Sequence, residues 1–562
     1  MKKTLLAFAL ACAALFLTQC RKAIFEQTGG NLTGETIEVS LNVDNGGSKT
    51  VIDGNVVKWK TGDKLYVVGE TDGCLGHISA QNDGVSAYFT GAITKVTTAQ
   101  KFHYYYIGDD SKEFTLDGDL YTYDISSQTG KIDDITKNLH LMHGVSDSPI
   151  AVGTTNLGTI AMTSMISIVK LQFSMASGVK ETLGDKVICT GGCSAVKFNV
   201  KSGSFDSENR VRYKKNIYLN EVTTSVDGIY YMIVIPGTQT LEFSQGLIGK
   251  SYRCPDGGFA ANTFYSNVKS VELGELPYLP AIFTVNNGSD GIQGTFDDTQ
   301  VKFSKGNLQY IGSATSPYWK FAEHQFEVVG GSQATAATNV DRDLFGWGTS
   351  GYHQSSDGYN KHYLPYSTSN TPNDKYKTNR FGYGPSTNVK PEGPSPSTGN
   401  VSGSYYDWGV YNDISNDGSL GVGSWRTLTG DECGNLINNR LDASSHYGFG
   451  TVGTVHGLIV LPDEWIGPTV RTGGNFDTNT YSDLEWKDLE FHGAVFLPVE
   501  GYRYGTPITD EGSIGRYWSG TYNDYGNSQI LSIKLDNNVC SVGTGSSDRC
   551  AGYSVRLVRD AE

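Results

Sequence analysis

The chain has 562 residues and carries 59 Asp and Glu against 44 Lys and Arg, a formal net charge of −15. This acidic balance, without a cluster of basic residues, argues against nucleic acid as a partner, because phosphate binding needs Lys and Arg gathered on one surface. Only 18% of residues are charged, and 69 Gly and 33 Tyr stand against 6 Met, which is typical of strands and loops. We therefore expect a mainly β protein of several domains.

The N-terminus has the pattern of a lipoprotein signal peptide over residues 1–20. Two lysines precede an apolar run from Leu5 to Leu17, and Cys20 follows. The alternative is an uncleaved anchor helix, but the run is shorter than the roughly 20 residues that span a bilayer. Gln19 departs from the small residue that is usual before a lipidated cysteine. We expect Cys20 to carry the lipid, such as palmitate, that holds the precursor to the outer membrane, with residues 21–35 as a polar tether.

Short strands separated by polar turns dominate the N-terminal half. Thr36 to Val43 alternates apolar and polar residues, the period of a half-buried strand. Asp53, Gly54 and Asn55 form a hairpin turn signal, because these residue types tolerate positive φ. This regular punctuation predicts two β-sandwich domains, at 36–160 and 161–282. Further strands are expected at 63–68, 102–107, 166–173, 196–200 and 230–236.

Two pairs of cysteines lie close together in the sequence. Cys189 and Cys193 bracket a tight turn, and Cys540 and Cys550 bracket a polar segment that we expect to be a loop. Either pair fits a disulfide in an oxidising compartment, and the alternative is that these thiols are small buried hydrophobic groups. No C-x-x-C pair occurs, so a structural zinc site is not expected.

A change of composition marks a third domain at 283–562, which we expect to be α+β. Every Trp but Trp59 lies there. Capping boxes predict two helices, one beginning at Thr429 with Glu432 three residues later and one at Ser482 with Glu485. Two segments, Ile530–Leu535 and Tyr553–Val558, are expected to pair as strands. The large aromatic residues are expected in the core rather than stacking on a ligand: Phe345, Trp347, Trp408 and Trp425. The core is also expected to contain the adjacent pair Val495 and Phe496.

Ligand contacts are expected in two polar loops, at 522–527 and 537–549, displayed on the paired strands. Tyr supplies rigid contact area and Asn adapts by hydrogen bonding, the chemistry of recognition surfaces. The candidate ligand-binding residues are Tyr522, Asn523, Asp524, Tyr525, Asn527, Asn537, Asn538, Asp548 and Arg549.

The N-terminal half resembles the fimbrillin superfamily of Bacteroidetes. The resembling segments are Lys49–Lys64, Met162–Phe173 and Tyr230–Gly237. The resemblance implies two transthyretin-like β-sandwiches, and subunits that polymerise after a protease removes an N-terminal strand and a neighbour's extended segment replaces it. Lys49 is the expected cleavage site, because it follows the exposed turn 45–48, of the kind that proteases prefer.

The C-terminal region resembles the C-type-lectin-like domains of Bacteroidetes surface proteins, a fold similar to formylglycine-generating enzymes and to retroelement-diversified variable proteins. The collinear motifs are Val301–Tyr310, Trp319–Glu323, Asp343–Gly351, Asp407–Asn412, Trp425–Glu432, Ala494–Pro498, Tyr517–Thr521 and Ser554–Val558. The enzyme activity would need a close pair of reactive cysteines, but Cys540 and Cys550 lie in a different context without a group that lowers a thiol pKa. The calcium-binding sugar motif of animal lectins is absent, so neither a metal nor a cofactor is expected.

Together these features predict a fimbrial tip or accessory pilin and adhesin at the cell surface, rather than an enzyme. The chain continues past its second sandwich into a whole domain instead of ending in a strand to donate, which fits a subunit at a tip. The expected partners are other pilin subunits by donor-strand insertion, a surface glycan or protein ligand, and the outer membrane through the lipid anchor. The alternative is a glycan-binding outer-membrane lipoprotein that never polymerises, and a weaker one is an enzyme of the formylglycine-generating type.

Overall fold

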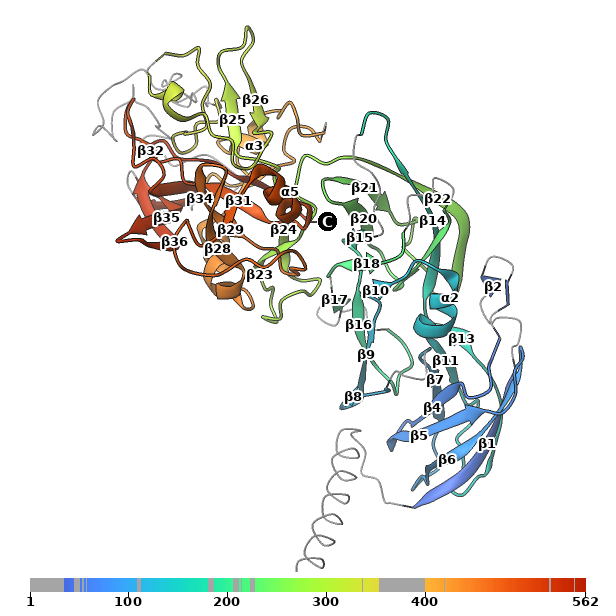
Figure 1. The fold of residues 1–562 in the computed structure, drawn as a ribbon. Coiled ribbons are helices and arrows are strands. Elements are labelled where there is room, and N and C mark those ends of the chain that lie inside the picture. Colours follow the sequence, from blue (N-terminus) through green and yellow to red (C-terminus); the bar gives the residue numbers. More distant parts are fainter. Residues whose placement is uncertain are drawn as a thin grey trace, which may run out of the picture. The chain divides into compact units, whose positions relative to one another are not determined.

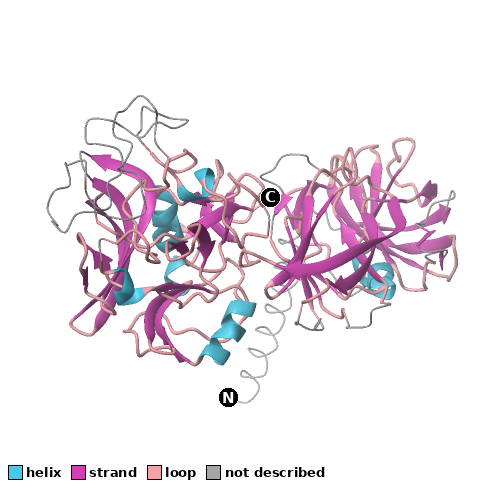
Figure 2. Ribbon diagram, turned by 90° about the horizontal axis from the view of Figure 1, so that it is seen from above, coloured by secondary structure: helices cyan, strands magenta, loops and turns pink. Residues whose placement is uncertain are grey.

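The computed structural model describes residues 35–44, 51–52, 55–56, 58–108, 113–179, 186–205, 212–213, 215–222, 228–335, 337–352, 400–418, 420–524, 527–549 and 551–561. The protein is mainly β, with 46% strand and 9% helix, as the composition predicts (Figure 2). Two compact units are present: Met1–Ala176, Thr182–Phe243 and Ser251–Glu272 form the first, and Ser177–Glu181, Ser244–Lys250 and Leu273–Glu562 form the second. Cys20 and Lys49 lie outside the described residues.

The first eight-stranded sheet has the order β12-β1-β6-β5-β4-β7-β11-β13. β1 alternates as its sequence predicts, with Val39, Leu41 and Val43 buried. They share a core with Trp59, whose ring meets Phe89 edge to face at 5.2 Å. The strands are β1 (Thr36–Asp44), β4 (Lys64–Gly69), β5 (Gly73–Ala80), β6 (Ala87–Thr94), β7 (Phe102–Tyr106), β11 (Met142–Val145), β12 (Asn156–Ala161) and β13 (Thr163–Ser164).

The hairpin expected around Asp53–Asn55 is confirmed, since β2 (Val51–Ile52) pairs with β3 (Asn55–Val56). A second eight-stranded sheet has the order β10-β18-β15-β20-β21-β22-β14-β19, and a four-stranded sheet the order β17-β16-β9-β8 (Figure 1). Their strands are β8 (Leu116–Asp117), β9 (Leu120–Asp124), β10 (Ser127–Gln128), β14 (Ser167–Met175), β15 (Val187–Thr190), β16 (Ala195–Asn199), β17 (Arg212–Tyr213), β18 (Ile217–Leu219), β19 (Tyr230–Val234), β20 (Thr240–Gln245), β21 (Ile248–Arg253) and β22 (Thr263–Glu275). A short helical segment precedes β11: α2 (Ile132–Asp134) and η1 (Ile135–Leu139).

Cys189 and Cys193 are buried thiols that donate to backbone oxygens, Cys189 to Thr190 and Cys193 to Ala195. Of the two interpretations open for this pair, the structure therefore has the small buried hydrophobic group. The other pair is described only in part, because Cys550 lies outside the described residues while Cys540 is a buried thiol.

The second unit contains several small sheets. Their strands are β23 (Phe283–Asn286), β24 (Thr299–Phe303), β25 (Leu308–Ile311), β26 (Tyr318–Phe321), β27 (Arg426–Thr427), β28 (Tyr447–Val452), β29 (Val455–Val460), β30 (Thr480–Tyr481), β31 (Val495–Pro498), β32 (Tyr502–Arg503), β33 (Ile508–Thr509), β34 (Ile514–Asp524), β35 (Asn527–Asp536), β36 (Val539–Asp548) and β37 (Leu557–Asp560). The helical segments are η3 (Gly330–Gln333), α3 (Trp408–Tyr411), α4 (Gly430–Gly434), η4 (Asn435–Asn439), η5 (Ala443–Ser445) and α5 (Asp483–Phe491).

Both predicted capping boxes are present, at the start of α4 and of α5. The side chains expected in the core are buried there, each at most 1% exposed: Phe345, Trp347, Trp408, Trp425, Val495 and Phe496. Their burial supports packing as the role of these side chains.

The expected pairing of Ile530–Leu535 with Tyr553–Val558 is wrong. The first segment belongs to β35, which pairs antiparallel with β34 and β36. The second ends in β37, which pairs with β24 and β27 instead. The expected loop at 537–549 is likewise wrong over most of its length, because Val539–Asp548 forms β36. Its Ser- and Gly-rich sequence has little strand propensity, but β35 supplies a full ladder of backbone hydrogen bonds.

Candidate functional site

The predicted ligand residues lie at two opposite ends of the β34–β35–β36 meander. Asn523 lies near the end of β34, and Asn527 begins β35 opposite Asp548. Asn537 and Asn538 form the tight turn to β36, with φ of 48° and 64°. Because strands of this length extend roughly 30 Å, the turn cannot contribute to the same small site as the other residues. Tyr525 and the side chain of Asp524 lie outside the described residues.

Tyr522 and Arg549 have contacts within the protein. The Arg549 guanidinium carbon lies 5.7 Å from the centre of the Tyr522 ring and 5.5 Å from that of Trp347. Arg549 is only 2% exposed, and Tyr522 packs half-buried against the aromatic core. The hydroxyl of Tyr504 donates to Asp548. Truncating Tyr522 is therefore expected to lower stability.

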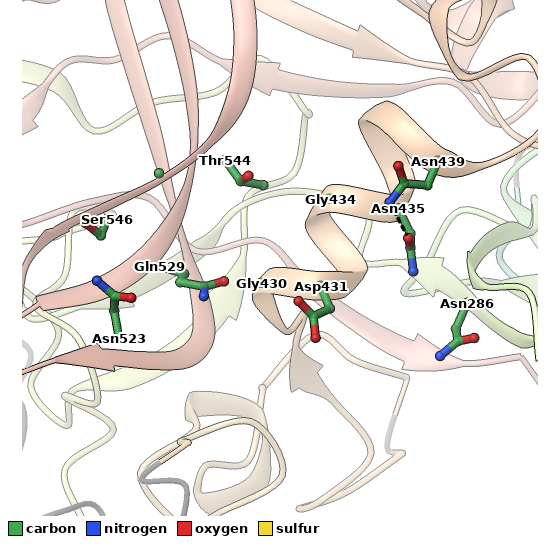
Figure 3. A pocket seen from close by; sticks show the side chains of 11 residues that line it. Asn286, Gly430, Asp431, Gly434, Asn435, Asn439, Asn523, Gln529, Thr544 and Ser546 are labelled. Carbon is green, nitrogen blue, oxygen red and sulfur yellow. Dashed lines mark hydrogen bonds between the residues drawn. The ribbon is translucent and has the colours of Figure 1, made fainter.

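A polar pocket of about 730 Å³ lies between the start of α4 and the end of the meander that holds Asn523 and Ser546 (Figure 3). This volume is in the range of pockets that bind small ligands. Of the predicted ligand residues whose side chains the structure describes, only Asn523 lines this pocket. The pocket is lined by Asn286, Gly430, Asp431, Gly434, Asn435, Asn439, Asn523, Gln529, Thr544, Gly545 and Ser546.

The sheet side of the pocket continues a face that elsewhere packs into the core. Directly opposed residues of β35 and β36 share a face, and the register pairs Leu531 with Thr544 and Gln529 with Ser546. Further along the same face, Ile533 and Cys540 are buried in the core that also holds residues of α4 and η4. This face of the sheet changes from apolar to polar at Gln529. At that point α4 and the sheet therefore enclose a polar pocket instead of packing an apolar core.

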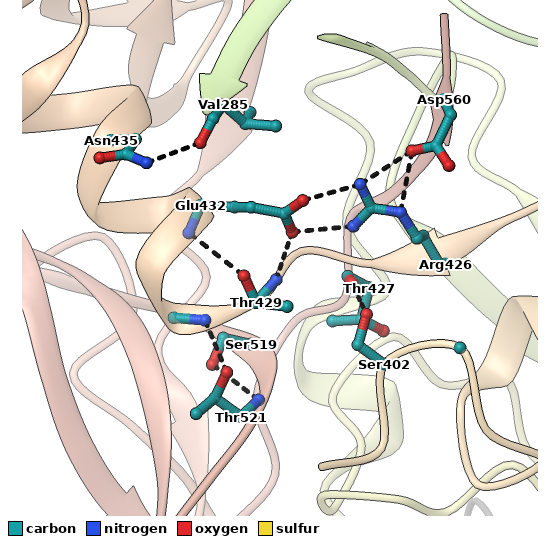
Figure 4. A network of polar contacts seen from close by, with 12 residues as sticks. Val285, Ser402, Arg426, Thr427, Thr429, Glu432, Asn435, Ser519, Thr521 and Asp560 are labelled. Carbon is teal, nitrogen blue, oxygen red and sulfur yellow. Dashed lines mark hydrogen bonds and ion pairs between the residues drawn. The ribbon is translucent and has the colours of Figure 1, made fainter. Parts of the chain in front are cut away.

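Hydrogen bonds fix where α4 begins (Figure 4). The Thr429 hydroxyl accepts from the Glu432 amide at 3.2 Å, and the Glu432 carboxylate accepts from the Thr429 amide at 2.7 Å. Arg426 donates to both Glu432 oxygens at 2.8 Å and also to Asp560. Burial alone would lower the pKa of Arg426, but hydrogen bonds and opposite charge from Glu432 and Asp560 outweigh it and raise that pKa.

A second chain of hydrogen bonds joins the helix to the sheet. The Gly430 amide donates to the Thr521 hydroxyl at 2.8 Å, and the Thr521 amide donates to the Ser519 hydroxyl at 3.3 Å. That hydroxyl in turn donates to the carbonyl of Gln529 at 2.9 Å. The two walls of the pocket are thus held at a defined separation.

Gly430 allows the side chain of Gln529 to lie against the helix. A Cβ at position 430 would overlap the Gln529 carboxamide, so any other residue there would displace it. Gly434, one turn later, has a helical φ of −62° and no atom within 4 Å of an added Cβ. A side chain at 434 would therefore enter the pocket without strain.

The pocket offers hydrogen-bonding groups that the protein leaves unused. Within the described residues, the side chains of Asn523, Gln529, Thr544 and Ser546 make no hydrogen bond to the protein. On the opposite side, Asn435 donates to the Val285 carbonyl and Asn439 donates to Asn435, each at 2.8 Å. One wall is thus held in place by internal contacts, and the other is available to a ligand.

Sequence reasoning missed Gln529, Thr544 and Ser546. The signal for Gln529 was present, because it is the polar break in an otherwise apolar alternation that runs to Leu535. Thr544 and Ser546 carry no such signal, because the Ser- and Gly-rich segment that contains them has little strand propensity.

Two buried thiols of the second unit, Cys433 and Cys540, have raised pKa values. Burial raises the pKa of Cys433 to about 12 and that of Cys540 to about 11. Over the described ranges, no three His, Cys, Asp or Glu side chains gather closely enough to hold a metal ion. None of the helices in those ranges is long and apolar enough to cross a bilayer.

No family model and no curated protein matches the chain. Among solved structures, the chain is similar to a "putative cell adhesion protein" of Bacteroides uniformis ATCC 8492, at 17% identity over 43% of this chain and 96% of that one, with a TM-score of 0.28. A protein of the same description from Bacteroides ovatus ATCC 8483 gives 14% identity, 43% and 95% coverage, and a TM-score of 0.28. A fimbrilin of Porphyromonas gingivalis W83 gives 15% identity, 40% and 73% coverage, and a TM-score of 0.24. At TM-scores this low, the likeness carries no inference about fold or function.

Proposed function

We propose that the chain is a surface lipoprotein of the pilus type, in which the N-terminal sandwiches serve assembly and the C-terminal domain serves adhesion. In this proposal Cys20 carries the lipid of an outer-membrane precursor, and the sandwiches at 36–160 and 161–282 are transthyretin-like. Residues 283–562 are a lectin-like adhesin domain that places the subunit at a pilus tip or as an accessory subunit. The ligand is a glycan or a protein on a host or microbial surface.

The observation that carries the proposal is the position of β1. This strand pairs antiparallel with β6 and parallel with β12, so it has a neighbour on each side. Its inward side chains Val39, Leu41 and Val43 are at most 4% exposed. Loss of β1 would leave two unpaired strand edges and an apolar groove, which a strand from a neighbouring subunit could fill by β-augmentation.

Cleavage after Lys49 tests this assembly route. We expect pilus fractions from the native host to contain the chain without residues 36–43, as read by mass spectrometry of N-terminal peptides. Lys49→Gln should block incorporation into pili, whereas Lys60→Gln, at an exposed position after the hairpin, should not. Pili that contain the chain with residues 36–43 attached would contradict strand exchange.

The second candidate is a glycan-binding lipoprotein that never polymerises. The polar pocket favours it, because the described residues that line it all belong to the second unit and none belongs to β1. Export to the surface without any pilus-bound form would distinguish this candidate from the first. An enzyme of the formylglycine-generating type is disfavoured, because burial raises the pKa of the Cys540 thiol and so disfavours the thiolate that would act as a nucleophile.

A further inference from the structure

The pocket between α4 and the meander is built for an uncharged, hydroxyl-rich ligand. We propose that it binds a neutral saccharide, with Gln529 as a central contact and Gly430 as the residue that positions it. This inference rests on the proposed adhesive function and adds to it the location of the site and the class of ligand.

Charge disfavours an anionic ligand. Among the described residues that line the pocket, Asp431 is the only one with a charged side chain, and it is acidic. Arg426, just before α4, is held by Glu432 and Asp560. A sialic acid, a uronate or a sulfated sugar would bring a second negative charge beside Asp431 without a cation to balance it.

Polarity disfavours an apolar ligand. The described part of the lining consists of amides, hydroxyls, glycines and one carboxylate, without an apolar side chain. A hydrophobic ligand would gain no apolar contact there and would remove water from polar groups that it could not satisfy.

Among the described residues of the pocket, the side chains that make no hydrogen bond to the protein offer both donors and acceptors, as sugar hydroxyls require. Asn523 and Gln529 each offer a carbonyl oxygen and an amide nitrogen, and Thr544 and Ser546 offer hydroxyls that both donate and accept. Sugar hydroxyls also donate and accept, so each can bond to either type of group. These four side chains come from three adjacent strands, which hold them in fixed relative positions.

Gly430 fixes where the Gln529 side chain can lie in the pocket. The Gln529 side chain lies where a Cβ at 430 would be, and the hydrogen-bonded chain through Thr521 and Ser519 holds the two elements together. Among the described residues, the pocket lining includes no aromatic ring. We therefore expect weak single-site binding, on the order of millimolar, that becomes effective when many copies engage one surface.

The test uses the full chain on an array that carries neutral hexose and N-acetylhexosamine oligosaccharides beside their sialylated and sulfated forms. We expect binding to neutral glycans. Gly434→Gln, which places a side chain in the pocket, should reduce that binding at least roughly tenfold, because the contacts of several hydrogen bonds are lost. Gln529→Ala should reduce it by roughly threefold to tenfold.

Gly543→Gln is the matched control. Gly543 lies on β36 outside the pocket, and an added Cβ there also meets no atom within 4 Å. Its binding should equal that of the wild type, and all three variants should keep the wild-type melting temperature. If Gly434→Gln does not fold, Gln529→Ala decides the question alone.

The inference would be overturned by neutral-glycan binding that survives both pocket substitutions, or by a preference for the sialylated or sulfated forms. Adhesion to cells without binding to any neutral glycan would also overturn it, and would leave the proposed adhesive function in place. A chain that neither reaches the surface nor adheres would instead contradict the proposed function itself.

Discussion

Two histidines of the first sheet lie in contact below the surface. His103 Nδ1 and His143 Nε2, on the paired strands β7 and β11, are 2.9 Å apart, and the Tyr105 ring stacks on His143. A hydrogen bond between two ring nitrogens requires one to donate and the other to accept, so the accepting nitrogen cannot carry a proton. Burial, followed by the nearby His103, lowers the pKa of His143 to about 4. Burial also lowers the pKa of His103, although Glu70 opposes this.

This pair predicts a loss of stability in acid. The unfolded chain binds more protons than the folded chain between pH 6.5 and about 4, so the free energy of unfolding should fall as pH decreases through that window. The contribution of His143 is on the order of 3 kcal/mol. Urea unfolding at pH 7 and pH 4.5 should give a smaller difference for His143→Gln than for the wild type. His77→Gln, at an exposed position on β5, should keep the wild-type difference; a wild-type slope in His143→Gln would refute the assignment.

Two short helices of the second unit begin with the same reciprocal cap in different surroundings. At α5, the side chain of Ser482 and its backbone amide bond with Glu485, at an exposed helix end. Thr429 at α4 bonds with Glu432, which also accepts from Arg426. Arg426 donates in turn to Asp560, at the end of β37. The cap of α4 therefore affects the position of a pocket wall, whereas the cap of α5 affects one helix end.

We expect unequal costs when the two caps are removed. Thr429→Ala should lower the free energy of unfolding by about 1–2 kcal/mol, and Ser482→Ala by about 0.5–1 kcal/mol. Denaturant unfolding of both variants gives the comparison. Thr429→Ser should restore most of the loss, because a serine hydroxyl accepts the same hydrogen bond. Equal losses for the two alanine variants would mean that the wider network around Arg426 adds nothing.

On the scale of the whole molecule, each unit has a hydrophobic core of its own. Leu41 is fully buried in the core of the first sheet, and Leu458 is fully buried in a core of the second unit. Domains with separate cores commonly unfold as separate cooperative units.

Substitutions in the two cores should therefore affect different transitions. Leu41→Ala and Leu458→Ala should each cost about 2–5 kcal/mol, the range for a leucine deleted from a packed core. Calorimetry should show one melting transition lowered by Leu41→Ala and another lowered by Leu458→Ala. Val539→Ala, at an exposed position, serves as the control. A shift of the same single transition in both core variants would mean that the units unfold together.

Local patterns in the sequence were sufficient for the features that depend on neighbours along the chain. The alternation in Thr36–Val43, the hairpin around Asp53 and the caps at Thr429 and Ser482 are present as predicted. Each arises from interactions between residues a few positions apart. The burial of the large aromatic residues was predictable too, because their apolar area is costly to leave in water.

Tertiary structure alone decided which strands pair and where a pocket forms. Partners for Ile530–Leu535 could not be read from its own alternation, since any strand of suitable length could bond to its edges. Its pairing with β34 and β36 made a strand of the polar segment Val539–Asp548 and brought Ser546 opposite Gln529. The contact of Gln529 with Gly430 joins positions almost a hundred residues apart, and only the packing of α4 on the sheet creates it. The sequence by itself therefore determined the mainly β class and the local elements, while the site depends on long-range contacts that no local pattern encodes.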